Sequence, residues 1–540
     1  MKDSIKDVQK NIYNYLKNKA HTLEGKKSNE LIKYQRDQNR LNNRKFYSSN
    51  IGELSSSIDD SEIIYLGDFH TFDQSSRNLK RIIDIIKSKK HEFAIGLELV
   101  HVNHQKFIDY FLAGHITELE FLESINYTES WRFPWTYYKT FFEIAKKTNI
   151  PIIALNTQGS LSQRDKKAAK VLAEFHKNYP QKKILVLFGE YHIVKNKLPN
   201  QVLKCLNKSV IQTIIHQNLD EVYWKLSKSN KPLMDKVLKF NKREYILLTS
   251  APWLKYESQI YWYEHLSEDP EFDIHEYIIE NGALNFSENV PENFYFLCQH
   301  INKTMQLDID DEKLEEFTLY DHIRLEQVQK SLMKAPSTKI QNLYHSLIKR
   351  GRSFKIYNQP RYFCPNYSIN RLSYIAGIHC YITLKPKNYL EDLLSKNKRE
   401  EFFYYHFEQC LIAYFCSKLI NPYRKCDMYR DYKNLLKGRS IKGSKRSLYK
   451  TGLSILDKKK TPIKDQIKGY RLLGLYNLGR MLGHMVGDIL FDTVFLKDEE
   501  SFHQLAHEII LKEVSEDKFR YILEKVAYKN NYKDSFKRTF

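Results

Sequence analysis

One short pattern, Gly-acid-any residue-His, occurs twice in this chain and limits its possible folds more than any other feature. The first copy, at 67–70, directly follows the apolar run 63–66, and the second, at 189–192, follows the apolar run 184–188. Continuous apolar runs of this length predict buried β-strands. In an open α/β sheet, ligands bind beyond the carboxyl ends of the strands. The pattern therefore predicts that the two His side chains face one crevice at that edge.

Strand and helix patterns alternate from about residue 60 to residue 250. Apolar runs predict strands at 62–67, 93–98, 151–155, 183–188, 209–215 and 244–249. Amphipathic spacing predicts helices between them, at 73–89, 103–113, 117–124, 135–147, 162–178 and 198–206. Strands that alternate with helices pair in parallel, and continuously apolar strands are covered on both faces. The predicted fold class is α/β, a parallel sheet with helices on both faces, in a domain at 55–270.

The chain on either side of this domain has a different character. Residues 1–54 are polar and predict a helical N-terminal extension, and 271–540 predict a mainly α-helical domain of unknown role with one extended piece at 374–385. In the latter, Gly479, Gly483 and Gly487 recur every four residues. Because glycine in mid-helix costs about 1 kcal/mol relative to alanine, this one-sided stripe predicts close contact with a second helix.

The net charge and the targeting signals limit the expected partners and location of the protein. The formal net charge is +21, and the segment 437–471 predicts an exposed basic loop. Such charge favours an anionic partner, nucleic acid or acidic lipid, although a Lys-rich composition and a solvated linker are the simpler explanations. The N-terminus has no apolar signal sequence and no lipobox Cys, and no window reaches the about 20 apolar residues of a membrane span. The expected location is the cytoplasm, without a transmembrane segment.

The side chains expected at the carboxyl edge are those of metal or acid–base chemistry. They are Asp68, His70, Glu98, Asp165, Glu190 and His192. Neutral His and ionised carboxylates are ligands for Zn, Mn or Fe, and such a metal makes hydroxide from bound water near neutral pH. Taken one at a time, Glu98 is also explained by a helix cap or a surface Lys, and Asp165 by the dipole of the helix it opens.

We assign expected roles to these residues as follows. His70, Glu190 and His192 are the expected metal ligands, and Glu98 is the expected proton carrier. Asp68, Arg164 and Asp165 complete the catalytic set, with Arg164 placed to steady an oxyanion. Walker, GxGxxG and GxSxG motifs are missing from the sequence, which disfavours NTP hydrolysis, dinucleotide binding and Ser-type esterase chemistry.

An aromatic cluster lies between two of the predicted helices. Trp131, Trp135 and Tyr138 belong to it, and Tyr191 adds a ring beside the second His motif. Aromatic side chains of this kind line pockets for flat ligands or peptides. The same cluster is equally explained as packing of a loop onto the sheet.

The ordered set of motifs resembles the ChaN family of the haem-binding uptake/Tiki superfamily, whose relatives include the Tiki metalloproteases, TraB proteins and erythromycin esterases. The resemblance covers roughly 60–250. It rests on the two His motifs, Gly96-Leu97-Glu98 with the helix from Gln105 to Gly114, Trp131, Trp135, Tyr138, Arg164-Asp165 and Leu198-Pro199. This chain has Asp68 where Glu is commoner in the family.

The resemblance implies two functions. Tiki-type relatives imply a metal-dependent hydrolase of a peptide, ester or amide, whereas ChaN lipoproteins imply binding of haem through Tyr and His in iron uptake. For the haem function, Tyr138, Tyr191 and His104 are chemically eligible ligands. A third hypothesis is a non-catalytic scaffold that binds an anionic partner through the basic C-terminal half.

Overall fold

The computed structural model describes residues 2–526, with gaps at 25–26, 208, 228–235, 267–289, 322, 336, 358–359, 366, 439–440 and 458–460. The chain folds into two compact units. One is an α/β unit that begins at Ile12 and ends at Tyr277, and the other is a helical unit that follows it and includes the first 11 residues. Among the described residues, no helix combines the length and the apolar character needed to cross a membrane.

The α/β unit is built on an eight-stranded sheet with the order β1-β7-β8-β6-β2-β5-β3-β4. Its strands are β1 (Tyr47–Ser48), β2 (Ile63–Asp68), β3 (Phe93–His101), β4 (Ile152–Asn156), β5 (Lys183–Gly189), β6 (Gln212–Gln217), β7 (Lys236–Asn241) and β8 (Glu244–Leu248). The six consecutive strands from β8 to β4 in this order pair in parallel, whereas β7 pairs antiparallel with β8 and with β1. The predicted parallel sheet is confirmed, and the sequence patterns missed β1 and β7.

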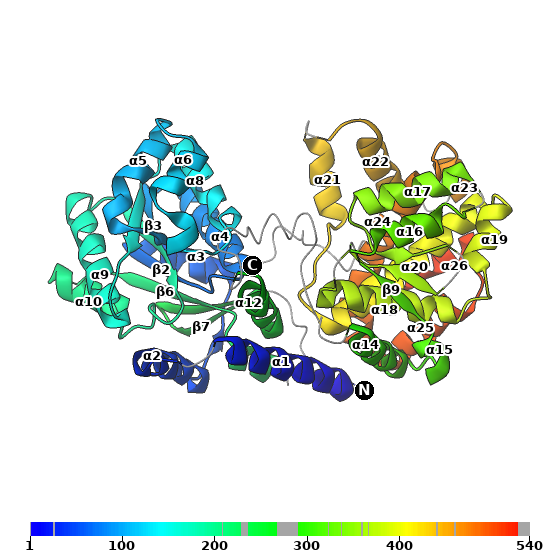
Figure 1. The fold of residues 1–540 in the computed structure, drawn as a ribbon, viewed down its shortest axis with the longest axis horizontal. Helices are drawn as coiled ribbons and strands as arrows, with labels where there is room; N and C mark the ends of the chain where they lie inside the picture. Colours follow the sequence, from blue (N-terminus) through cyan, green and yellow to red (C-terminus); the bar gives the residue numbers. More distant parts are fainter. Residues whose placement is uncertain are drawn as a thin grey trace. The chain divides into compact units, whose positions relative to one another are not determined.

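Helices cover both faces of the sheet, as predicted (Figure 1). The helices of the unit after its N-terminal extension are α4 (Asp73–Ser88), η2 (Val102–His104), α5 (Gln105–Ala113), α6 (Glu118–Ser124), α7 (Tyr127–Ser130), α8 (Thr136–Thr148), α9 (Leu161–Asn178), α10 (Leu198–Leu206), α11 (Asp220–Ser227) and α12 (Pro252–Leu266). Ile64 and Leu66 of β2 pack on the face covered by α4 and α8, and Ile63 and Tyr65 pack on the face covered by α9 and α10. This alternation follows from the period of two along a strand.

The N-terminal extension is helical, but most of it is part of the α/β unit. It consists of α1 (Lys2–Glu24), α2 (Asn29–Asn39), η1 (Arg40–Asn43) and α3 (Ile51–Asp60), with β1 between the last two. Glu30 of α2 accepts hydrogen bonds from the backbone N–H groups of Leu161 and Ser162 at 3.0 and 2.9 Å, where α9 begins. Asp37 forms a buried ion pair of 2.6 Å with Lys197. These contacts fix α2 beside the carboxyl edge of the sheet.

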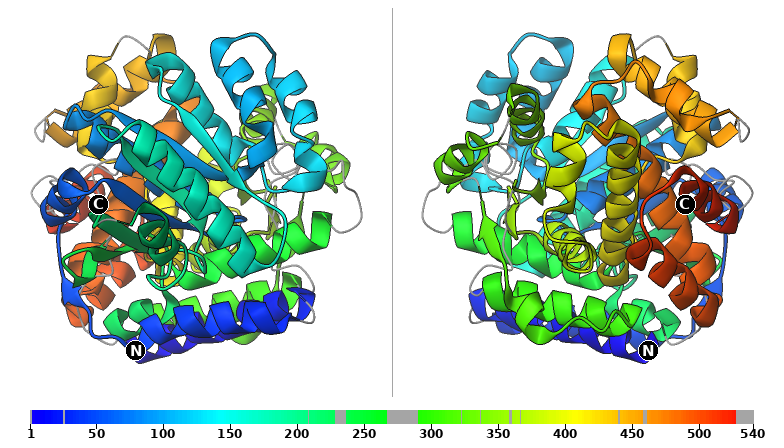
Figure 2. Two further views of the ribbon diagram at one scale, coloured as in Figure 1. Left: turned by 90° about the vertical axis from the view of Figure 1, so that its left-hand side faces the viewer. Right: turned by 90° about the vertical axis from the view of Figure 1, so that its right-hand side faces the viewer.

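The second unit is helical, as predicted (Figure 2). Its helices are α14 (Val290–Met305), α15 (Asp311–Glu315), α16 (Leu325–Leu332), α17 (Thr338–Lys349), α18 (Ile369–Thr383), α19 (Tyr389–Ser395), α20 (Arg399–Ile420), α21 (Tyr429–Lys437), α22 (Gly443–Asp457), α23 (Ile463–Ile467), α24 (Leu472–Ile489), η3 (Leu490–Phe495), α25 (Glu499–Leu511) and α26 (Glu516–Val526). A small sheet joins β10 (Phe354–Lys355), β11 (Arg361–Phe363) and β9 (Thr318–Tyr320).

Two predictions for this unit were wrong. The extended piece expected at 374–385 is mostly α18, whose apolar residues pack on α20 rather than in a sheet. The segment 437–471 is not one exposed loop, because α22 and α23 lie within it. Leu453 and Leu456 of α22 are buried, and this apolar face folds the segment despite its many Lys and Arg residues.

The glycine stripe of α24 packs against the backbone of α20, which confirms the predicted helix–helix contact. A Cβ atom built on Gly479 would lie 3.0 Å from the backbone nitrogen of Phe407. The corresponding distances are 2.5 Å from Gly483 to the carbonyl oxygen of Phe407 and 2.5 Å from Gly487 to that of Leu411. Glycine is therefore required at Gly483 and Gly487, where the two backbones approach too closely for any side chain, and the fit at Gly479 is tight.

We expect Gly483→Ala to lower the free energy of unfolding of this unit by about 1–3 kcal/mol, because the added methyl group forces α24 away from α20. Urea denaturation followed by circular dichroism measures the change. Gly469→Ala is the matched control, since a Cβ there meets no atom within 4 Å. Equal stability of the two variants would show that the helix pair adjusts without loss.

Candidate functional site

The candidate site lies where three neighbouring strands, β2, β5 and β3, reach the carboxyl edge of the sheet. His70 follows β2 by two residues, and Gly189 ends β5 directly opposite Asp68 in the strand register. Glu98 lies within β3, which continues to His101, so the predicted strand end at Glu98 is three residues early. Pairing of β3 with β4 shifts register between Leu97 and His101, and Glu98 lies at this irregularity. The sheet order thus places the two His motifs and Glu98 side by side.

His70 is held by a buried carboxylate and a buried tyrosine. The Nδ1 atom of His70 donates a hydrogen bond of 2.8 Å to Asp68 Oδ2. The same oxygen accepts a hydrogen bond of 2.9 Å from the hydroxyl of Tyr138. Burial opposes the charged imidazole, but the neighbouring Asp68 and Glu98 carboxylates outweigh it and raise the pKa of His70. In this tautomer Nε2 is the basic nitrogen.

His192 is held in the same way by a second pair of residues. Its Nδ1 atom donates a hydrogen bond of 2.5 Å to Asp165 Oδ1. Asp165 Oδ2 accepts a hydrogen bond of 2.7 Å from the hydroxyl of Tyr34 in α2. Asp165, at 2% exposed, is the fifth residue of α9, which the Ser160 capping box begins. The edge therefore carries two Tyr–Asp–His units, each with its Nδ1 atom bound from behind.

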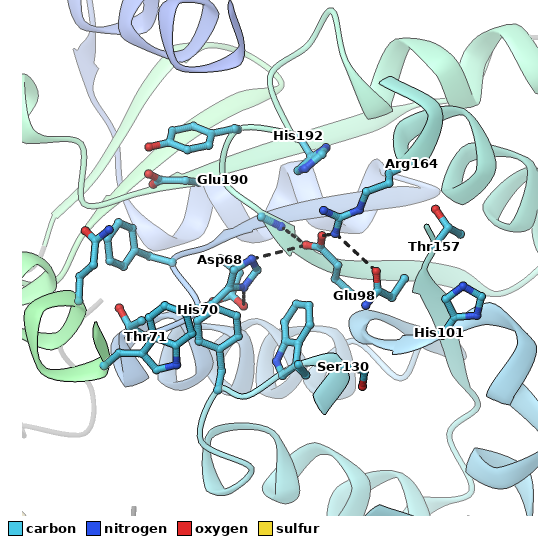
Figure 3. Close-up of a pocket in the computed structure, with 18 of the residues that line it drawn as sticks. Asp68, His70, Thr71, Glu98, His101, Ser130, Thr157, Arg164, Glu190 and His192 are labelled. Carbon is cyan, nitrogen blue, oxygen red and sulfur yellow. Dashed lines mark hydrogen bonds and ion pairs between the residues drawn. The ribbon is translucent and has the colours of Figure 1, made fainter. Parts of the chain in front are cut away.

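Glu98 lies between the two histidines and is neutralised locally. Its carboxylate forms an ion pair with Arg164 and accepts a hydrogen bond of 2.7 Å from the backbone N–H of Gly189. His70 Nε2 lies 3.8 Å from Glu98 Oε2 (Figure 3). Burial at 3% exposed acts to raise the pKa of Glu98, but the charges of Arg164, His70 and His192 hold it below its ordinary value. Glu98 is thus an ionised carboxylate at the centre of the site.

Gly189 leaves the space in which these groups converge. A Cβ atom there would lie 3.3 Å from Glu98 Oε2, 3.3 Å from His192 Cδ2 and 3.4 Å from His70 Nε2. Any side chain at Gly189 would enter this space. The glycine of the second motif is therefore required by the site and not only by the turn.

Glu190 is separated from this group. Its carboxylate points away from His192 and Arg164 (Figure 3). Burial raises the pKa of Glu190, while Lys255 and Gln38 act to lower it, so its neighbours belong to another cluster. Among the residues that the structure describes, no group of three His, Cys, Asp or Glu side chains is arranged to hold a metal ion. The expected ligands His70, Glu190 and His192 are not gathered into one set.

The site opens into a pocket of about 670 Å³ with an aromatic wall. Trp131 and Phe133 lie against His70, with ring centroids 4.7 and 4.9 Å from the imidazole. Phe133 in turn stacks on Trp262 of α12 at 4.8 Å. Tyr191 also lines the pocket. The volume and lining suit a small ligand with an apolar part.

Two of the four predicted pocket residues lie outside this lining. Trp135 is 7% exposed and packs in the core against Phe121 and Phe142, with its indole N–H bonded to Glu118. Tyr138 is 2% exposed and supports Asp68 instead. Trp135 directly precedes α8 and Tyr138 lies in its first turn, and the start of this helix turns both side chains toward buried surroundings and away from the pocket.

Sequence reasoning missed Tyr34 and the aromatic residues of α12. Tyr34 lies in the predicted N-terminal extension, and nothing in its neighbourhood along the chain indicates a distant Asp. The docking of α2 brings it to Asp165, and Lys197 lies over its ring at 4.0 Å. Burial and the Asp165 hydrogen bond raise the pKa of Tyr34, so its hydroxyl stays protonated and donates. An amphipathic pattern in α2 was the one available signal.

We expect Tyr34→Phe to lower the free energy of unfolding of the α/β unit by about 1–3 kcal/mol, because the buried Asp165 side chain loses a hydrogen-bond donor. Thermal and urea denaturation measure this effect. Tyr110→Phe is the control, since Tyr110 is 47% exposed. A Tyr34 variant as stable as this control would contradict a supporting role for the Tyr34 hydroxyl.

Comparisons with known proteins give a family match for part of this unit. The family model described as "Haem-binding uptake, Tiki superfamily, ChaN" matches residues 54–164. A solved structure titled "Cofacial heme binding to ChaN of Campylobacter jejuni" is similar at 15% identity, over 37% of this chain and 96% of that chain, with a TM-score of 0.26. No significant match is found among curated proteins. The family match contains Asp68, His70 and Glu98 and ends at Arg164, short of the span to about 250 that the motifs indicated. Residues 54–164, which carry β2, β3 and β4 of the sheet, therefore match the family model of the haem-binding uptake/Tiki superfamily, ChaN.

Proposed function

We propose that the pocket at the carboxyl edge is the active site of a hydrolase that cleaves a peptide, ester or amide. One observation carries this proposal: two histidines, each held at Nδ1 by a buried aspartate, line one pocket on either side of an ionised glutamate. A buried carboxylate that fixes the tautomer and orientation of a histidine is the arrangement of general acid–base catalysis. Two such units provide one base and one acid.

His70 is the proposed base. Its Nε2 accepts a proton from the attacking water, and the imidazolium that forms is stabilised by Asp68 at 2.8 Å and by Glu98 at 3.8 Å. His192, supported by Asp165, donates a proton to the leaving group. The Nε–H of Arg164 is buried and has no hydrogen-bond partner among the described residues, which leaves a donor for the developing oxyanion.

A divalent metal does not fit the donors of this site. The Glu98 carboxylate already binds Arg164 and the Gly189 N–H, and Glu190 points elsewhere. The guanidinium of Arg164 also supplies the positive charge that a metal would bring. We therefore route no step of the proposed reaction through a metal ion.

The test is hydrolysis of a panel of p-nitrophenyl esters, anilides and short peptides with aromatic acyl groups, with and without a chelator. The expected result is turnover of at least one substrate class that survives chelation and dialysis. Turnover that is lost on chelation and restored by Zn, Mn or Fe would overturn the metal-free mechanism in favour of a metal-dependent one. Lack of turnover over the whole panel would count against the hydrolase.

The pH dependence of this activity follows from the pKa of His70. Because that pKa is raised above the ordinary value of about 6.5, kcat/KM should rise with pH along a limb centred above pH 6.5. In Asp68→Asn the raising charge is lost while burial remains, so the limb should move to lower pH. The pH–rate profiles of the two proteins test this directly. If the pH–rate profile of Asp68→Asn has its limb at the same pH as that of the natural chain, the general base is a group other than His70.

Haem binding is the second candidate function, favoured by the family of residues 54–164 and by the aromatic wall. The stacked rings of Phe133 and Trp262, with Trp131 edge-on to Phe133, supply an apolar side, and His70 and Tyr191 are lining residues that are able to ligate iron. Tyr138 and His104 do not line the pocket. A Soret band that develops on haem addition and shifts in Tyr191→Phe would support this function. Haem uptake unchanged in His70→Ala/Tyr191→Phe would remove the pocket from consideration.

A further inference from the structure

A cluster of arginines lies in the helical unit, which the proposed hydrolase site does not involve. Arg424 follows α20, and its guanidinium carbon lies 5.3 Å from the ring centroid of Tyr374 and 5.1 Å from that of Tyr414. His484 of α24 contacts the same two tyrosines. Its Nε2 is 3.1 Å from the Tyr374 hydroxyl, and its ring centroid is 4.8 Å from that of Tyr414. Arg480 lies one helical turn before His484.

Three guanidinium groups act together on His484. Burial lowers the pKa of His484 well below its ordinary value, and Arg480, Arg424 and Arg352 lower it further. Burial and then Arg480 also lower the pKa of Arg352, so these two side chains repel each other. The imidazole is neutral and the three arginines concentrate positive charge around it.

A carboxylate lies in the same region, since Asp488 and Arg424 both act on the pKa of Tyr414, but Asp488 is ion-paired with Lys418 at 2.9 Å. Among the described residues, no ion pair joins Arg352, Arg424 or Arg480 to a carboxylate, although charges withdrawn from solvent are usually paired in proteins. The Nε–H of Arg352 is buried without a hydrogen-bond partner among these residues. Arg424 donates to the carbonyl oxygen of Asn370 at 2.8 Å and lies over the rings of Tyr374 and Tyr414, and none of these contacts supplies an anionic partner.

We propose that Arg352, Arg424 and Arg480 form a binding site for a phosphate group, with Tyr374 and His484 as neutral hydrogen-bonding partners. A planar guanidinium presents paired N–H donors that match phosphate oxygens. A doubly charged anion at this position would offset the repulsion among the three arginines. The site takes either inorganic phosphate or a phosphomonoester, which share this chemistry.

The test is isothermal titration calorimetry of the full chain in phosphate-free buffer at constant ionic strength, with inorganic phosphate and then phenyl phosphate as probes. We expect saturable binding that weakens at least tenfold in Arg480→Gln and Arg424→Gln. Arg471→Gln is the charge-matched control, because Arg471 is an exposed residue at the start of the same helix. Tighter binding of phenyl phosphate would assign the site to a phosphomonoester, and equal binding would assign it to inorganic phosphate.

Stability provides a second readout. Without phosphate, Arg480→Gln should be at least as stable as the natural chain, because the substitution relieves repulsion, whereas phosphate should raise the melting temperature of the natural chain alone. Arg480→Lys, which keeps the charge but loses the paired donors, guards against misfolding of the Gln variant. Heat changes reproduced by sodium chloride, or binding retained in Arg480→Gln, would overturn the proposal.

Discussion

Replacing His70 or His192 by alanine is expected to lower kcat/KM for the hydrolysed substrate by about 10²–10⁴-fold, the usual contribution of a positioned acid or base. The two losses should not add in the double variant, because both residues act in one proton-transfer sequence. Steady-state kinetics of the two single variants and the double variant measure this. The reason is geometric: each imidazole is held at Nδ1 by a buried aspartate, so no other group replaces its Nε2.

His115→Ala is the matched control for these variants, because His115 is exposed and does not line the pocket. Circular dichroism and melting curves separate lost chemistry from lost folding. A His70 variant that keeps full activity would remove it as the base. Losses that multiply in the double variant would show that the two histidines act in independent steps.

Replacing Arg164 by alanine is expected to lower the free energy of unfolding at pH 7 by about 3–5 kcal/mol, because Glu98 then remains as a buried charge without its partner. Glu98 is 3% exposed, so solvent does not replace the guanidinium. Arg164 is the main charge that lowers the pKa of Glu98 against the effect of burial. Without it, burial dominates and the pKa of Glu98 rises above its ordinary value of about 4.3.

The destabilisation caused by Arg164→Ala is expected to depend on pH. As the pH falls through the raised pKa, Glu98 takes up a proton in the folded Arg164→Ala variant and the unpaired charge disappears. The destabilisation relative to the natural chain should therefore shrink below that pH. Urea denaturation at several pH values measures it, and Arg164→Ala/Glu98→Gln is the control, expected to recover much of the loss at pH 7. If the loss in free energy of unfolding does not change with pH, it is caused by lost packing of the Arg164 side chain and not by the charge of Glu98.

Much of the α/β unit was predictable because its strands are buried on both faces. Each continuous apolar run, such as Ile63 to Leu66, became a strand, and the Gly-acid-any residue-His motifs reached one edge as expected. The antiparallel strand β7 was missed because it lies near the end of the sheet, where only part of it is covered. The helical nature of 437–471 was obscured by its charge, which reports solvent exposure and not backbone conformation.

The chemistry of the site depended on contacts that local patterns do not contain. The sequence already identified Asp68, His70, Glu98, Asp165 and His192, and all five meet at one pocket or support it. Glu190, which the motif groups with them, also lines this pocket, but its carboxylate points away from His192 and Arg164 because successive residues after a strand point in different directions. The role of the basic C-terminal half toward an anionic partner stays a prediction.

The order of apolar runs and motif residues by itself determined the fold class, the edge at which the site lies and the identity of its histidines, because burial and strand order are encoded residue by residue. Only the tertiary structure decided which carboxylate holds which ring, that Arg164 neutralises Glu98, and that Tyr34 from a distant helix completes the second unit. These pairings join residues as far as 131 positions apart. Their energies depend on distance and burial in space, which a linear pattern does not specify.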